Sequence, residues 1–220
     1  MPVYKHVDKN FFKKWSQEMA YILGFFSADG YLTKNKRGAE FLCIEITDKK
    51  LLFKIRETLK SEHKISLRKS FGKTAYRLQI GSIEMCEDLK LLGLKERKTK
   101  NLHMPKIPNE FVKDFVRGYF DGDGNVWVGQ IHKDRKNRML ALRVVLTSCS
   151  KNFLASLKDI LEQFDIIKGV LSTGKGNYYR LTYSISSSLK LYDFMYNKLT
   201  SNLFLPRKKD VFERYIKMRS

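Results

Sequence analysis

Two aspartates, Asp29 and Asp123, occupy the same position in two similar stretches of the chain, ILGFFSADG (residues 22–30) and VRGYFDGDG (residues 116–124). Each aspartate precedes a glycine at the end of a segment whose apolar residues predict a helix. Because the last carbonyls of a helix already carry about half a negative charge, a carboxylate there is destabilising unless a cation accompanies it. Two such carboxylates side by side would suit Mg²⁺, which binds carboxylates together with water and phosphate oxygens.

Small residues in both stretches predict how the two aspartates could meet. Gly24 and Ala28 lie four positions apart, as do Gly118 and Gly122, so each pair occupies one face of its helix. Glycine inside a helix costs about 1 kcal/mol relative to alanine, which indicates that the missing side chains serve a close contact. We therefore expect the two helices to pack side by side in the same direction. In the alternative interpretation each Asp-Gly pair only forms a turn.

The chain repeats further landmarks behind each aspartate in the same order, which predicts two related halves. The motifs are offset by 94 residues (123 − 29 = 94). The landmarks are EIT ending at Thr47 and VLT ending at Thr147, YRL at residues 76–78 and 179–181, and RK at residues 97–98 and 207–208. We predict an N-terminal repeat with a short extension over residues 1–100, a linker over 101–108 and a C-terminal repeat over 109–220.

Periodicity and turn residues predict the same order of elements in each half. We expect a helix at about 17–29 or 109–123, strands at 31–36 and 39–47 or 125–132 and 138–147, and a helix opened by Asp48 or Ser150. Two strands joined by a glycine-containing turn follow, and then a helix at 83–92 or 188–199. The predicted fold class is α+β, with two pseudo-symmetric αββαββα repeats that each contain an antiparallel four-stranded sheet.

The charge balance favours a polyanionic partner. The 220 residues include 43 Lys and Arg against 23 Asp and Glu, a formal net charge of +20, which is typical of proteins that bind nucleic acid or anionic membranes. No apolar run reaches the roughly 18 residues of a membrane span, and the first ten residues lack a signal-peptide core. We expect a location in the cytoplasm, associated with the nucleoid, or in an organellar matrix, and no secretion. Three distant cysteines and four scattered histidines predict neither disulfides nor a zinc site.

The two stretches resemble the LAGLIDADG motif, and the two-copy layout is similar to that of monomeric LAGLIDADG homing endonucleases. This resemblance covers nearly the whole chain beyond about residue 15. It implies a site-specific endonuclease that makes metal-dependent double-strand breaks with short 3′ overhangs in a long DNA target. It also implies Mg²⁺ as the cofactor, with Mn²⁺ as a substitute, and a monomer that needs no protein partner. The chain departs from the motif at Ser27, where the family has its first Asp, and at Arg117, where it has Ala.

The resemblance also implies roles for individual residues. Asp29 and Asp123 would bind the metal with help from the carbonyls of Ala28 and Gly122. Polar residues after the second strand of each repeat would order metal-bound water, and basic residues near the end of each repeat would stabilise the phosphate. These match Asp48 and Ser148, and Lys98 and Lys208. Asp48 as a helix cap only, and the lysines as a solvated basic face, remain open alternatives.

The two sheets are expected to contact the bases, because their outward residues alternate with core residues and arginine and glutamine can form paired hydrogen bonds in the major groove. An ordinary solvated sheet face is the alternative for each position. Lys73 and Lys175 lie in matching turns and are expected to contact phosphates. The candidate DNA-contacting residues are Thr33, Asn35, Arg37, Ser66, Arg68, Ser70, Lys73, Arg77, Gln79, Trp127, Arg143, Lys175, Arg180, Thr182 and Ser184.

Two other functions stay open at this point. Some members of the family act as RNA maturases that assist intron splicing, and others could retain DNA binding as regulators after losing cleavage. The presence of both aspartates favours cleavage.

Overall fold

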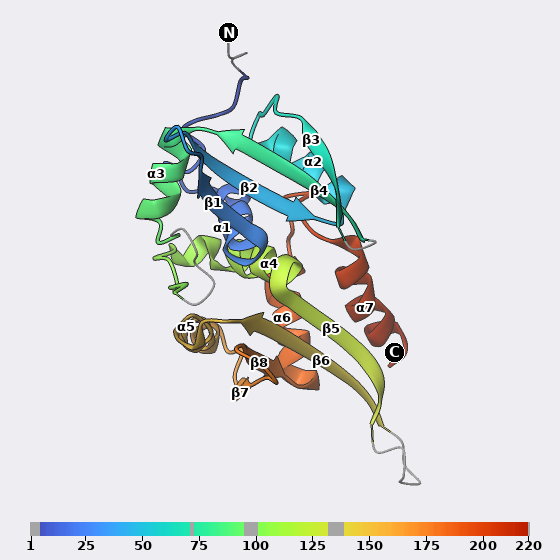
Figure 1. Ribbon diagram of the computed structural model, residues 1–220. Helices are drawn as coiled ribbons and strands as arrows, with labels where there is room; N and C mark the ends of the chain where they lie inside the picture. Colours follow the sequence, from blue (N-terminus) through green and yellow to red (C-terminus); the bar gives the residue numbers. More distant parts are fainter. Residues whose placement is uncertain (1–4, 71–72, 95–100, 132–138, 220) are drawn as a thin grey trace.

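The computed structural model contains two similar halves that meet along a central pair of helices, α1 (Gln17–Asp29) and α4 (Val112–Asp123) (Figure 1). The structure describes residues 5–70, 73–94, 101–131 and 139–219, with the side chains of Ser70 and Lys73 outside this description. One sheet lies on each side of the helix pair in Figure 1, and helices cover the inner faces of both sheets. The helix pair therefore forms the junction between the halves.

Both halves follow the predicted order of helix, two strands, helix, two strands and helix. In the first half α1 is followed by β1 (Gly30–Lys34), β2 (Glu40–Ile46), α2 (Lys49–Thr58), β3 (Ile65–Ser70), β4 (Lys73–Gly81) and α3 (Ile83–Leu91). In the second half a short 3₁₀ turn (Asn109–Phe111) leads into α4, followed by β5 (Gly124–Ile131), β6 (Met139–Ser148), α5 (Lys151–Gln163), β7 (Val170–Thr173), β8 (Tyr179–Tyr183) and α6 (Ile185–Tyr196).

Each sheet has four antiparallel strands, as predicted, in the orders β1-β2-β4-β3 and β5-β6-β8-β7. The inner rows of the first sheet include Leu42, Ile44 and Leu78, all buried beneath the helices. Alternate residues therefore point to the outer face, as the period of two requires. The class α+β and the two pseudo-symmetric repeats are confirmed.

Local polar residues begin the helices that follow the second strand of each half. The Asp48 side chain accepts a hydrogen bond from the backbone N–H of Leu51 at 2.9 Å, and Ser150 Oγ accepts one from Phe153 at 3.3 Å. These bonds satisfy donors that have no partner within the first turn of a helix. Both predicted N-caps are therefore confirmed, and they fix where β2 and β6 give way to helix.

The C-terminal part of the chain differs from the prediction in two ways. Helix α6 begins at Ile185 rather than at residue 188, because Ser188 is buried inside it and donates from Oγ to the carbonyl of Tyr183 at 2.9 Å. An additional helix, α7 (Pro206–Lys217), was not predicted. Its many charged residues obscure a stripe of three buried side chains at positions 208, 212 and 215. Proline at its first position is a helix-start signal that could have revealed it.

The contact between α1 and α4 follows the glycines. A Cβ added at Gly24 would lie closer than 3.0 Å to the carbonyl of Phe115, and one added at Gly118 would lie equally close to the carbonyl of Tyr21. Phe115 and Tyr21 are themselves 94 residues apart (115 − 21 = 94), so the two contacts are related by the repeat. The expected close, parallel packing along small-residue faces is confirmed, and it brings the C-terminal ends of both helices to the same place.

Aromatic and aliphatic side chains from both halves form the core around this helix pair, including Tyr21, Phe25, Phe115 and Tyr119, which are at most 1% exposed. None of the helices in the described part of the chain has the length and apolar character needed to cross a membrane.

Candidate active site at the ends of the paired helices

Asp29 and Asp123 are the last residues of α1 and α4, and the backbone of the next residue, Gly30 or Gly124, is extended and enters a strand. Asp29 is half-buried and Asp123 is exposed. A Cβ added at Gly122 would lie 3.3 Å from Oδ2 of Asp29, so the end of α4 passes directly beside that carboxylate. The two acids of the motifs therefore belong to one small region between the sheets.

Asp29 and Asp123 both influence the pKa values of the same two neighbouring residues, Tyr119 and Lys208. Burial raises the pKa of the Tyr119 hydroxyl, and the carboxylates of Asp123 and Asp29 raise it further. Burial lowers the pKa of Lys208 to about 8, while carboxylates including Asp29 and Asp123 act in the opposite direction. One tyrosine and one lysine therefore experience both carboxylates.

The oxygen atoms at this place fit a hard divalent cation. The described residues contain no cluster of three or more His, Cys, Asp or Glu side chains that could hold a metal by themselves. Two carboxylates and the carbonyls of Ala28 and Gly122 would leave coordination positions for water and for phosphate oxygens, which is the arrangement that Mg²⁺ commonly adopts. The chemistry of the available donors thus agrees with the metal predicted from sequence.

A cavity of about 270 Å³ lies against Asp29, and several charged side chains line it. Glu45 and Asp48 reach it from the end of β2, and Arg207 reaches it from the start of α7. The described residues that line it are Phe25, Asp29, Glu45, Ile46, Thr47, Asp48, Leu51, Asp121, Gly122, Leu205 and Arg207. Asp48 therefore caps α2 and also borders the site, so the two roles considered for it are compatible.

The pairing of the strands gives a different alignment of the two repeats, at the end of the second strand, from the one that the sequence landmarks gave. Ile46 pairs with Tyr76 in the first sheet, whereas Ser148 pairs with Tyr179 in the second. Because both tyrosines begin a YRL sequence, Ser148 corresponds to Ile46, and the counterpart of Asp48 is Ser150. The match of Thr47 with Thr147 is thus displaced by two residues.

Ser148 is 7% exposed, and its Oγ accepts a hydrogen bond from the backbone N–H of Ser150 at 3.1 Å. Ser150 Oγ in turn donates to the carbonyl of Leu102 at 2.7 Å. Both serine hydroxyls are thus engaged in hydrogen bonds with the backbone at the start of α5. A catalytic role for Ser148 stays a prediction.

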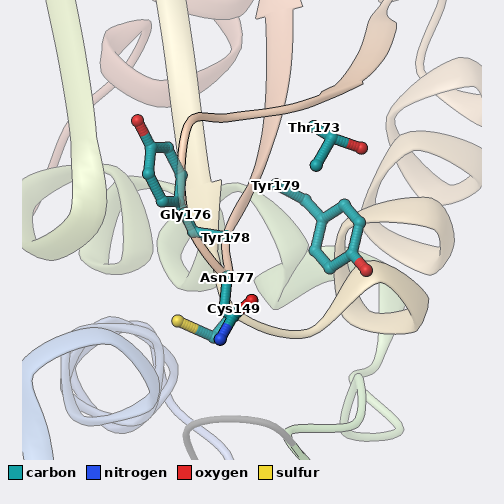
Figure 2. A pocket seen from close by; sticks show the side chains of 6 residues that line it. All are labelled: Cys149, Thr173, Gly176, Asn177, Tyr178 and Tyr179. Carbon is teal, nitrogen blue, oxygen red and sulfur yellow. The ribbon is translucent and has the colours of Figure 1, made fainter.

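A second cavity lies beside the end of β6, and none of the described residues that line it carries a carboxylate (Figure 2). Cys149, which the register makes the counterpart of Thr47, lines this cavity, and the rings of Tyr178 and Tyr179 point to opposite sides of the backbone that carries them (Figure 2). Thr173, Gly176 and Asn177 are the other described residues of the lining. The surroundings of the two strand ends are therefore chemically unequal.

Lys208 is 6% exposed and points into the end of α4. Its Nζ donates to the carbonyls of Phe120, Asp121 and Gly124 at 2.6, 2.7 and 2.6 Å, and lies 3.4 Å from the carbonyl of Gly122. A cation there offsets the negative end of the helix dipole. Lys98, its counterpart in the RK landmarks, lies outside the described residues.

Two residues of the second motif that sequence analysis did not assign to the site connect it to the C-terminal segment. Arg117 is completely buried, donates to the carbonyls of Leu203 and Met195, and forms an ion pair with Asp114 at 2.8 Å. Asp121 accepts hydrogen bonds from the hydroxyl of Tyr21 at 2.8 Å and from the backbone of Leu205 at 2.9 Å. The departure from the motif at Arg117 was a visible signal, but the two carbonyls that it binds are 78 and 86 residues away in sequence.

The predicted base-contacting residues of the first half lie on the outer face of the first sheet or in its turns. Arg68 and Ser66 are exposed on β3, and Arg77 and Gln79 are half-buried on β4. Arg77 donates to the Cys43 sulfur at 3.4 Å and lies over the ring of Tyr31. Thr33 is on β1, Arg37 is exposed in the turn to β2, and the side chains of Ser70 and Lys73 lie outside the described residues.

Asn35 has a structural role in that turn. Its side-chain oxygen accepts hydrogen bonds from the backbone of Arg37 at 2.9 Å and of Ala39 at 3.0 Å, and the turn ends β1 at Lys34. The predicted strand at 31–36 is therefore shorter than expected. A base contact by Asn35 would have to use its amide nitrogen.

In the second half, Trp127 is 44% exposed on β5 and lies opposite Arg143 on β6. Arg180 is exposed on β8 and donates to the hydroxyl of Tyr178 at 2.7 Å, while Thr182 is half-buried beside it. Lys175 is exposed in the turn after β7. Ser184 lies beyond β8, at the residue before α6. Period two also places Asn125, Thr147, Ser172 and Glu45 on the outer faces, although they were not predicted to contact DNA.

Regions of much longer known proteins are similar in sequence to this chain. A region of replication factor C small subunit from Methanocaldococcus jannaschii is 27% identical over 81% of this chain, and a region of the RNA polymerase subunit Rpo1C from the same organism is 30% identical over 70%. The chain spans only 9% and 16% of the lengths of these two proteins.

Solved structures share the fold. The LAGLIDADG meganuclease I-AabMI bound to uncleaved DNA superposes with a TM-score of 0.63 at 18% identity, covering 90% of this chain and 89% of that one. Variants of the homing endonuclease I-DmoI superpose with a TM-score of 0.58 at 18% identity, covering 86% and 93%. The sequence model of the LAGLIDADG-like domain matches residues 16–92 and again residues 110–195. With the domain present twice and both motif helices paired at their centre, the chain belongs to the LAGLIDADG family.

Proposed function

We propose that this protein is a homing endonuclease that makes site-specific, metal-dependent double-strand breaks in DNA. The observation that carries the proposal is the meeting of Asp29 and Asp123 at the ends of α1 and α4, between two sheets of a strongly basic chain. A structural core would gain nothing from two acids at adjacent negative helix ends.

Divalent metal ions bound at this place would polarise the attacking water and stabilise the departing 3′ oxygen. Asp29 and Asp123 would hold the ions, with the carbonyls of Ala28 and Gly122 as further ligands. Structures of the related I-DmoI contain Mg, Ca or Mn together with DNA, which supports a divalent cofactor, with Mg²⁺ proposed here and Mn²⁺ as a substitute. Lys208 would hold the end of α4, and thereby Asp123, in position.

The outer faces of the two sheets would provide sequence recognition. Related structures with this fold are described as bound to their target DNA, which supports the same use of the sheets here. Arg68 on β3 and Arg180 on β8 are exposed on the outer faces of the two sheets and would read guanine edges in the major groove. Arg77 is already engaged with Cys43 and Tyr31, so it would contact a base only after exchanging one of these partners.

The recurrence of similar segments in unrelated proteins supports the homing part of the proposal. The matching regions occur in proteins described as replication factor C small subunit, RNA polymerase subunit Rpo1C and elongation factor 2, and they span 9%, 16% and 12% of those proteins. A segment shared by hosts without a common function behaves as a mobile element, which requires a DNA break at its insertion site.

The test is cleavage by the purified protein. A plasmid carrying the joined sequences that flank the reading frame, or a library of randomised sites, is incubated with Mg²⁺, Mn²⁺ or EDTA. We expect linear product with either metal and none with EDTA, and sequencing of the ends should show short 3′ overhangs. Stimulated splicing of a host intron RNA without any DNA cleavage would contradict the proposal and would instead indicate a maturase.

A further inference from the structure

The two basic residues at the start of α7, Arg207 and Lys208, lie in different surroundings. The sequence landmark RK suggested that the lysine contacts the phosphate. Lys208 is 6% exposed, however, and its Nζ already donates to three carbonyls at 2.6 to 2.7 Å. An ammonium group has three donors, so those of Lys208 are all used within the protein.

Arg207, one residue earlier, is exposed and lines the cavity that contains Asp29, Asp48 and Gly122. Among the described residues, no ion pair joins Arg207 to a carboxylate. Its backbone is held close to the site, because the preceding Leu205 donates to Asp121 at 2.9 Å and the following Lys208 is attached to α4. A long cationic side chain is thus anchored at the border of the metal-binding carboxylates.

We propose that the two residues divide the work of this site: Arg207 is the cation that contacts the DNA phosphate beside Asp29, and Lys208 is a positioning residue that never touches DNA. This inference rests on the proposed endonuclease function. A guanidinium offers two parallel N–H donors that match the oxygens of a phosphate, and it stays charged at any physiological pH. The cavity beside Cys149 in the other half has no described cationic residue in its lining.

The first experiment measures DNA binding without metal, so its readout is independent of cleavage. The logarithm of the affinity falls with the logarithm of the salt concentration by about 0.9 for each phosphate contact. We expect Arg207→Gln to lower this slope by about 0.9 relative to the unchanged protein. Lys208→Met, which keeps the buried stem and removes the charged group, should leave the slope unchanged and lower the melting temperature. Lys217→Gln removes one positive charge from the exposed last turn of the same helix and serves as the matched control.

The second experiment follows the two DNA strands separately under single-turnover conditions with saturating Mg²⁺. We expect Arg207→Gln to slow cleavage of one strand by about 100-fold, as removal of a donor to a charged transition state does, so that nicked DNA accumulates. Arg207→Lys should recover part of the rate, and Lys217→Gln should leave both strands unchanged.

The inference is overturned if Lys208→Met lowers the salt slope while Arg207→Gln does not, or if Arg207→Gln leaves the rates of both strands unchanged or slows both equally. These outcomes are distinguishable from failure of the proposed function, in which the unchanged protein cuts neither strand.

Discussion

The two motif helices make the same contact with each other but are held in place differently. At the interface, Gly24 and Gly118 allow equivalent approaches to the partner backbone. Next to these glycines, Leu23 and Ser27 of α1 occupy the positions that Arg117 and Asp121 occupy in α4 (117 − 23 = 94; 121 − 27 = 94). The interface between the helices is symmetric because both helices need the same close packing. The residues that attach each helix to its surroundings differ between the two halves.

The hydrogen bonds that these residues form differ in the sequence distance to their partners. Ser27 Oγ donates to the carbonyl of Leu23 at 2.8 Å, within its own helix. Asp121 instead joins Tyr21 of the other half to Leu205 before α7, and burial raises its pKa to about 6. The polar groups of α4 thus attach the C-terminal segment to the junction, which a single repeat could not do.

The interface can be broken symmetrically by adding one methyl group. Gly24→Ala and Gly118→Ala each place a Cβ closer than 3.0 Å to a backbone carbonyl of the other helix, so the helices must separate. We expect each substitution to lower the free energy of unfolding by about 3 kcal/mol, the upper part of the usual range for overpacking. Denaturant unfolding measures this, and cleavage should fall because the two aspartates move apart.

The comparison of the two glycine variants is a sharper test than either loss of stability alone. Gly24→Ala and Gly118→Ala should lower the free energy of unfolding by similar amounts, because they overpack equivalent sites. A difference of more than about 1 kcal/mol between the two losses would contradict a symmetric interface.

The buried ion pair of α4 can be replaced by the apolar residues that stand at the matching positions of α1. Arg117→Leu removes the partner of buried Asp114 and should lower the free energy of unfolding by about 3 to 5 kcal/mol. The counterparts of Asp114 and Arg117 in α1 are Ala20 and Leu23, so Asp114→Ala/Arg117→Leu recreates the apolar arrangement of the first helix. We expect the double variant to be more stable than Arg117→Leu alone, because no unpaired carboxylate remains.

A double-mutant cycle with Asp114→Ala completes this measurement. Additive losses would show that the ion pair at 2.8 Å does not couple the two residues, which would contradict the role assigned to it.

The smallest expected effect concerns the link between the halves. Asp121→Ser introduces the residue found at the same place in α1 and removes the bonds to Tyr21 and Leu205. We expect the free energy of unfolding to fall by about 1 to 3 kcal/mol, the usual penalty for leaving a buried partner unsatisfied. Tyr21→Phe removes only the hydroxyl donor and should cost less. If the tyrosine variant were the more damaging of the two, the bond to Leu205 would not be the main attachment.

Features set by neighbouring residues were predictable from sequence, and features set by distant partners were not. The N-caps Asp48 and Ser150 depend on a hydrogen bond three residues ahead, and the motif helices are marked by their own glycines. The burial of Lys208 depends on carbonyls 84 to 88 residues away, and no local pattern separates it from the exposed Arg207.

The second repeat also shows the effect of an insertion. The second repeat has eight more residues than the first between the motif aspartate and the end of the second strand (148 − 123 = 25; 46 − 29 = 17; 25 − 17 = 8). The landmarks Thr47 and Thr147 account for only six of them (147 − 123 = 24; 47 − 29 = 18; 24 − 18 = 6), so Asp48 was matched with Ser148 instead of Ser150, and only the pairing of Tyr76 and Tyr179 with their neighbouring strands reveals the difference.

Strand-resolved cleavage by Asp29→Asn and Asp123→Asn, with DNA binding measured in parallel, tests the central claim most directly. Each substitution keeps the size of the side chain and removes the charge that would hold a divalent ion. We predict that each variant binds target DNA in the absence of metal as tightly as the unchanged protein does, and that neither produces double-strand breaks with Mg²⁺ or Mn²⁺. Double-strand cleavage at the normal rate by either variant would contradict the account, because the acid from that half would then have no part in the reaction.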